Sequence, residues 1–268
     1  YNGVKKGERD DLKDKLGLVE DNQLTPNMVD RAKILAQRYF EDKGFKNAEI
    51  EILQHDDPSA PDKVVVDINV KKNGKMLINK INVYGNTVIP ERKLKGNIFT
   101  KGVLKTIREK DGFHNWFRSH KFVDSKYQEA KDNLQNYYAE LGYRDAIIVA
   151  DTVESIDEKH VDINIRVEEG NKYYIRDIEW VGNTVYNTNE LAYILKIQKG
   201  DVYNQKLLAD RISNDEDAVG NLYYNNGYVF YRLDPVETNI VGDSIDLEMR
   251  IYEGPQARIS RVKITGND

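Results

Sequence analysis

The chain has 268 residues, 40% hydrophobic and 32% charged, which is typical of a folded protein of two or three domains. Its formal net charge is −5 and its 40 basic residues are interspersed among 45 acidic ones, so it lacks the basic surface of a nucleic-acid-binding protein. Cysteine is absent, which excludes disulfides, thiol catalysis and cysteine-ligated zinc.

The first predicted elements are two helices followed by two strands. A short helix is expected near Glu8–Leu16, and Thr25-Pro26 predicts the cap and first turn of a longer helix. Alternating apolar residues predict strands near Phe45–His55 and Lys63–Lys71. We expect residues 1–75 to form one module that lacks an opening strand.

The next predicted module, residues 76–172, begins with a strand that ends at Tyr84. Pro90 suits the first turn of a short helix, and a long helix is expected near Ser125–Leu141. The loop between these helices is enlarged around Lys105–Lys121. Two further strands complete the module.

The third predicted module, residues 173–256, has the same order of elements. Its predicted elements are a strand (Tyr173–Val181), a short helix capped by Thr188 and ending near Lys196, a long helix (Gln205–Asn226) and two strands (Tyr228–Glu237 and Ser244–Tyr252). Residues 257–268 are predicted to be the first strand of a following module.

Three landmarks recur in fixed order and show that the chain is a repeat. They are a strand ending in Gly-Asn (Gly85, Gly182, Gly266), a helix-ending glycine whose aromatic successor is expected to begin the next strand (Gly44, Gly142, Gly227), and an alternating strand before a further glycine (Gly74, Gly170, Gly254). Gly74 follows the last apolar residue of its strand by one residue more than Gly170 and Gly254 do, which predicts a different turn there. The fold class is α+β: tandem β-α-α-β-β modules, each a three-stranded mixed sheet covered by two helices.

This strand order, the Gly-Asn strand ends, the Tyr-Tyr helix ends before Gly142 and Gly227, and the pairs Glu169-Gly170 and Glu253-Gly254 resemble POTRA domains of the BamA outer-membrane protein assembly factor family. The resemblance covers nearly the whole chain. It implies no enzymatic activity and no cofactor. It implies a position at the periplasmic face of the bacterial outer membrane and covalent continuity with a membrane β-barrel. The implied partners are unfolded outer-membrane proteins and accessory lipoproteins.

An open sheet edge is the predicted binding surface, because an added strand bonds through its main chain and so accepts many sequences. The favoured edge is Tyr143–Asp151, with candidate residues Tyr143, Arg144, Ala146, Ile147, Ile148, Val149 and Ala150. The alternative is an ordinary edge protected by charges or by a neighbouring module. The matching strand of the third module contains Pro235, which cannot donate a ladder hydrogen bond.

The enlarged loop contains Phe113, Trp116 and Phe117, which we expect to dock a partner or to pack on their own domain. His114 and His120 lie nearby, but no local carboxylate or thiol completes a ligand set, so no metal site is predicted. The short links at Glu169-Gly170 and Glu253-Gly254 are predicted hinges between modules.

Two alternative functions remain open at this point. One is the POTRA region of another outer-membrane translocation, assembly or secretion transporter of the same superfamily. The other is an enzyme or a carbohydrate-binding repeat protein, which would need a cleft with convergent polar groups.

Overall fold

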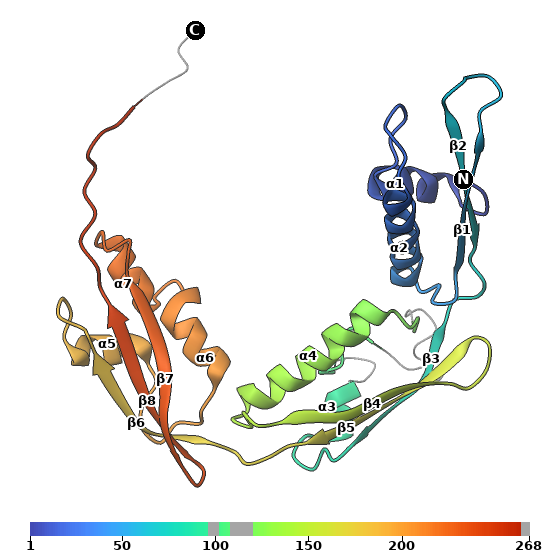
Figure 1. Cartoon of the computed structure of the whole chain (residues 1–268). Helices are drawn as coiled ribbons and strands as arrows, with labels where there is room; N and C mark the ends of the chain where they lie inside the picture. Colours follow the sequence, from blue (N-terminus) through green and yellow to red (C-terminus); the bar gives the residue numbers. More distant parts are fainter. Residues whose placement is uncertain (96–101, 108–119, 264–268) are drawn as a thin grey trace. The chain divides into compact units, whose positions relative to one another are not determined.

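The computed structural model describes residues 1–95, 102–107 and 120–263 (Figure 1). The chain divides into two compact units, Tyr1–Leu134 with Ile148–Val167 and Gln135–Ile147 with Glu168–Asp268. Among the described residues, no helix has both the length and the apolar character needed to cross a membrane.

The elements follow the predicted order and fall into three groups, here called modules 1 to 3. Module 1 contains α1 (Lys6–Leu16), α2 (Pro26–Asp42), β1 (Glu49–Asp56) and β2 (Val64–Lys71). Module 2 contains β3 (Leu77–Tyr84), α3 (Glu91–Lys95), α4 (Asp124–Glu140), β4 (Ile147–Ser155) and β5 (His160–Glu168). Module 3 contains β6 (Tyr174–Val181), α5 (Thr188–Leu195), α6 (Gln205–Ala209), α7 (Val219–Asn225), β7 (Arg232–Val241) and β8 (Ser244–Tyr252).

The sheets place the last strand of each complete module in the centre. The strand orders are β3-β5-β4 and β6-β8-β7. The opening strands β3 and β6 run parallel to β5 and β8, whereas β7 runs antiparallel to β8. These are the mixed three-stranded sheets that the sequence predicts, and the strand after the long helix lies at an edge.

Module 1 has a two-stranded sheet, β1-β2, and a single parallel bridge beside it. Asn2 pairs with Asn69, and its N–H donates to the carbonyl of Ile68 at 2.8 Å. Gly3 then has a φ of +75°, and a methyl group on it would strike the carbonyl oxygen of Val70. Gly85 and Gly182 face the carbonyls of Val167 and Ile251 in the same way, so Asn2-Gly3 occupies the place where an opening strand ends.

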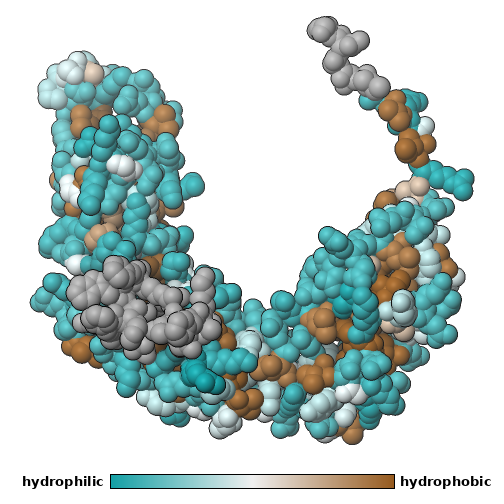
Figure 2. Space-filling view, turned by 180° about the vertical axis from the view of Figure 1, so that it is seen from behind, coloured by the Kyte–Doolittle hydropathy of each residue, from teal (hydrophilic) through white to brown (hydrophobic). Residues whose placement is uncertain are grey.

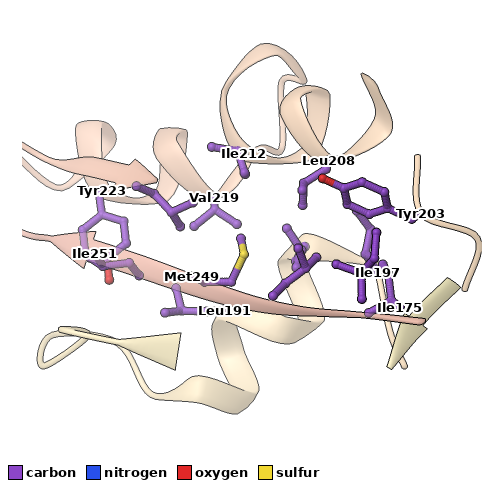
Figure 3. Close-up of a cluster of buried hydrophobic side chains, with 14 of the residues drawn as sticks. Ile175, Leu191, Ile197, Tyr203, Leu208, Ile212, Val219, Tyr223, Met249 and Ile251 are labelled. Carbon is purple, nitrogen blue, oxygen red and sulfur yellow. The ribbon is translucent and has the colours of Figure 1, made fainter. Parts of the chain in front are cut away.

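The core of module 3 shows how one apolar face per element builds each module. Alternate residues of β8, from Ile245 to Ile251, are buried against the helices. Figure 3 shows Met249 between Leu191 of α5 and Val219 of α7, with Tyr223 and Tyr203 towards opposite ends of the cluster. The period-2 pattern of the strand and the helical stripes therefore meet in a single layer of side chains.

The strand after each long helix begins four residues later than the sequence suggests, at Glu49, Ile147 and Arg232. The aromatic residue after the helix-ending glycine turns back onto the helix instead of starting the strand. Its N–H donates to a carbonyl of the last helical turn, and its ring packs edge-on against an aromatic ring of that turn, in the pairs Phe45–Phe40, Tyr143–Tyr138 and Tyr228–Tyr223. A further turn, closed by the N–H of Ala48, Ala146 or Tyr231, precedes the strand.

The long helix predicted over Gln205–Asn226 is broken. After α6 the chain makes one π-helical segment, Asp210–Asn214, and leaves the helix at Asp215 before α7 begins. The buried guanidinium of Arg211 holds this break: its Nη1 lies 2.5 Å from Asp217 Oδ1, and its Nε donates to the carbonyl of Leu195 at 3.2 Å. In addition, Asn187 rather than Thr188 caps α5, in a capping box with Glu190.

The turn near Gly74 does not differ as expected. Asn73 occupies the left-handed position, with a φ of +52°, where Gly170 and Gly254 have +68° and +65°. Its side chain donates to the carbonyl of Asn47 at 2.7 Å and to Glu49 Oε1 at 2.9 Å. Asparagine tolerates this conformation, so the backbone turn is kept without a glycine at that position.

Candidate functional site

The predicted edge strand of module 2 is β4, but the structure shortens the predicted surface. Tyr143, Arg144 and Ala146 lie in the turn before the strand, and Ala146 is buried. Ile147, Ile148, Val149 and Ala150 form its first half. Because β5 is the only neighbour of β4 within its described sheet, the other side of these residues is the sheet edge.

The second half of β4 is tied to its own module by side chains. Asp151 Oδ2 accepts hydrogen bonds from the Tyr127 hydroxyl at 2.8 Å and from Lys131 Nζ at 3.1 Å, both on α4. The hydrogen bond from Tyr127 lowers the pKa of Asp151, whereas burial and the same bond raise the pKa of Tyr127. Thr152 Oγ1 accepts from Asn164 on β5 at 3.2 Å. The part of β4 that we consider as a binding surface is therefore its first half, Ile147–Ala150.

This first half of β4 exposes apolar side chains. Ile147 is 48% exposed and Val149 is 40% exposed. Apolar residues on an unpaired edge are unusual, since edge strands are normally protected by charges, prolines or bulges. The surface made by Ile147–Ala150 is called the β4 edge below.

The corresponding edge strand of module 3, β7, has such protection. Pro235 lies within β7, and the pairing with β8 shifts register between Glu237 and Asn239. The carboxylate of Glu237 is engaged by the Tyr203 hydroxyl at 2.6 Å and by Arg144 Nη1 at 2.9 Å. The proline and the register shift are both of the kind that protects a strand edge, so β7 stays the poorer edge of the two as a prediction.

Arg144 belongs to the junction with module 3 instead of to an edge. Besides its ion pair with Glu237, its guanidinium carbon lies 5.6 Å from the centre of the Tyr173 ring. The Tyr173 hydroxyl donates to Asp145 Oδ2 at 2.6 Å, and this hydrogen bond raises the pKa of Tyr173. Sequence reasoning missed this cluster because its members are distant in the chain.

The predicted hinge residues Glu169 and Glu253 are buried carboxylates. Glu169 accepts from the Tyr138 hydroxyl at 2.7 Å. Glu253 accepts from the Tyr223 hydroxyl at 2.9 Å and from the Val185 N–H at 2.9 Å, and also from Thr184 Oγ1. Burial alone would raise the pKa of Glu253, but the bonds from Thr184, Val185 and Tyr223 outweigh it and lower the pKa.

Glu253 therefore fastens the end of the module at the point where the chain leaves it. Freedom to bend at this link is left to the residues that follow, beginning with Gly254, whose φ is +65°. The role of Glu169, Gly170, Glu253 and Gly254 as hinges stays a prediction.

A cavity of about 340 Å³ lies against module 3, lined by Glu140, by Ile175 of β6 and by residues of the segment from Ile197 to Leu208. Its two carboxylates have structural partners: Asp201 accepts from the Gln198 N–H at 2.9 Å, and Glu140 lies 3.9 Å from Lys206 Nζ. Among the described residues, no three histidine or acidic side chains are placed to hold a metal ion. Phe113, His114, Trp116 and Phe117 lie outside the described residues.

Comparison with known proteins identifies the repeat. The family model described as "POTRA: Surface antigen variable number repeat" matches residues 1–73, 76–170 and 173–254. The chain belongs to the POTRA family. The three matches cover the three groups of elements described above.

Several relatives of this POTRA chain are outer-membrane assembly factors. It is 23% identical over 197 residues to "Outer membrane protein assembly factor BamA" of Neisseria meningitidis, covering 71% of the chain and 23% of that protein. It is 22% identical over 236 residues to "Putative outer membrane protein assembly factor" of Treponema pallidum, covering 86% of the chain and 26% of that protein. The chain thus spans about a quarter of the length of these relatives.

A solved structure, POTRA domains 3–5 of Haemophilus influenzae BamA, matches 93% of this chain and 91% of its own length. The sequence identity is 17% and the TM-score 0.48.

Proposed function

We propose that this chain is part of the periplasmic POTRA region of a BamA-like outer-membrane protein assembly factor, and that it binds unfolded outer-membrane polypeptides as an added strand on the β4 edge. The proposal rests on the family match, on the names of the relatives and on one structural observation. That observation is the exposure of Ile147 and Val149 on an edge strand that, unlike β7, contains no proline.

The geometry suits a client without fixed sequence. Main-chain hydrogen bonds along β4 would supply affinity, and the exposed apolar side chains would contact alternate side chains of the client. Acidic side chains beside the edge, Asp145 and Asp151, are already bound to tyrosine hydroxyls. The edge therefore presents backbone and apolar surface and makes no use of a catalytic group.

Docking of accessory lipoproteins is a further part of this proposal. It rests on the resemblance of the sequence to POTRA domains of the BamA family, since the predicted docking loop at Phe113, Trp116 and Phe117 lies outside the described residues.

The test compares two double variants that add the same charge to the two edges. Ile147→Lys with Val149→Lys alters the β4 edge, and Ile240→Lys with Val241→Lys alters β7, where both residues are also exposed. Binding of a peptide from an outer-membrane β-strand is measured by NMR titration of the labelled chain.

We expect the β4 variant to weaken binding by about tenfold or more, a loss of at least ~1.4 kcal/mol, and to abolish peptide-induced shifts over residues 147–150. The β7 variant should bind like the wild type. Equal weakening by both variants, or shifts confined to the helices, would contradict strand addition at the β4 edge.

A further inference from the structure

The three helix-ending glycines make the same hydrogen bond to the chain that follows their module. Each has a positive φ, of +90°, +93° and +85° for Gly44, Gly142 and Gly227. Their carbonyls accept from the N–H groups of Met76 at 3.0 Å, Tyr173 at 2.9 Å and Ala257 at 2.8 Å. In the first two cases the donor is the residue just before the opening strand of the next module. This hydrogen bond therefore joins each module to the one that follows it.

At the first two junctions, the following module closes over the glycine with the residue three positions before α4 or α6. A methyl group on Gly44 would lie 3.4 Å from Lys121 Cβ, and one on Gly142 would lie 2.5 Å from Val202 Cγ1. The next residue then bonds back to the opening segment: the N–H of Phe122 donates to Met76 at 2.8 Å, and that of Tyr203 donates to Tyr173 at 2.9 Å. The two junctions share one geometry.

At both of these junctions, the residue two positions after the glycine is a cation that contacts the following module. Lys46 Nζ lies 4.7 Å from the centre of the Phe122 ring, and Arg144 contacts both the Tyr173 ring and Glu237. In both cases a cation of one module reaches an aromatic ring of the next.

Module 3 has Val229 at this position, and the surface around it is apolar. Val229 is 53% exposed and the adjoining Phe230 is 59% exposed. Tyr252 completes the surface, because Gly254 brings it together with Phe230: a methyl group on Gly254 would lie 2.9 Å from Phe230 Cβ and 3.4 Å from Tyr252 Cε1. Figure 2 shows hydrophobic residues gathered on this module and along the extended segment that leaves it.

We propose that Gly227, Val229, Phe230 and Tyr252 form the docking face for a further module that the chain enters at Ala257. The Ala257–Gly227 bond repeats the two complete junctions, and Val262–Asn267 repeats the strand landmark. Since valine stands where the two complete junctions have a cation, this junction is held by hydrophobic contact. The inference does not depend on client binding at the β4 edge.

The test uses the natural protein that carries this chain, with the photoreactive residue p-benzoylphenylalanine at position 229 or 230. A control places it at Tyr193 on α5, which is 82% exposed and lies outside the docking face. After irradiation, mass spectrometry maps the crosslinked peptides.

Positions 229 and 230 should crosslink within the same polypeptide to the stretch just before the long helix of the following module, and position 193 should not. Crosslinks from 229 and 230 to another polypeptide, to any other stretch, or to nothing would overturn the proposal.

Discussion

Replacing Glu253 tests whether a buried carboxylate holds the end of module 3 together. The side chain is 7% exposed and accepts from Tyr223, Val185 and Thr184, which belong to α7 and to the turn after β6. Glu253→Ala leaves these donors without their acceptor, and an unsatisfied buried donor costs about 1–3 kcal/mol. Because water can reach part of the resulting space, we expect a loss of about 3 kcal/mol in the free energy of unfolding of module 3.

Glu253→Gln removes the negative charge of the side chain but keeps nearly the same shape, so it tests the contribution of the charge. The amide keeps one acceptor oxygen but brings an NH₂ group among donors, so a loss of about 1–2 kcal/mol is expected at neutral pH. The matched control is Glu179→Gln on β6, an exposed position where a change within about 0.5 kcal/mol is expected.

The pH dependence follows from the direction of the pKa shift. The pKa of Glu253 is lowered on folding from an ordinary value of 4.5, so its contribution is complete above that value and is lost as the pH falls through the folded pKa. The difference between wild type and Glu253→Gln should therefore shrink as the pH is lowered below 4.5.

The assay is denaturant unfolding followed by tryptophan fluorescence. The chain has two tryptophans, Trp116 and Trp180, and Trp180 packs against the core of module 3. In a Trp116→Phe background the signal reports on module 3 alone. A loss below about 1 kcal/mol for Glu253→Ala, or a deficit of Glu253→Gln that stays constant with pH, would refute this reasoning.

Three further predictions concern the junction and the helix break. Gly142→Ala and Gly200→Ala both place a methyl group at a φ near +92°, but of the two only the methyl group at Gly142 meets a neighbour. In denaturant unfolding, Gly142→Ala should therefore lower the free energy of unfolding by at least about 1 kcal/mol more than Gly200→Ala. Equal losses would show that backbone strain alone accounts for the effect. A double-mutant cycle of Arg144→Met and Glu237→Gln should give a coupling of about 1 kcal/mol that falls with added salt, and additive effects would contradict the ion pair. Arg211→Met should lower the free energy of unfolding of module 3 by about 3 kcal/mol, because Asp217 and the carbonyls of Ile194 and Leu195 lose their donor. The control Lys206→Met, at an exposed lysine, should change it by less than about 0.5 kcal/mol. Both variants are measured in the same denaturant assay, and equal losses would contradict the role of Arg211.

The sequence by itself determined the repeat, the order of elements and the faces that are buried. Ser244–Tyr252 forms a strand over the range that its alternating apolar residues predict, and Thr25-Pro26 starts α2 as expected. These features are local: a period of two or of 3.6 residues and a capping side chain act within a few residues of one another. Family membership followed from the same local signals at a fixed period.

Only the tertiary structure decided where the strand after each long helix begins and which side chains meet. The rings of Phe45, Tyr143 and Tyr228 turn back onto their helices because aromatic partners are there to receive them, and this moves the edge to Ile147. Arg144, predicted for the edge, is instead paired with Glu237, far along the chain. Such contacts depend on which elements pack together in three dimensions, and a pattern that repeats along one strand or helix carries no record of them.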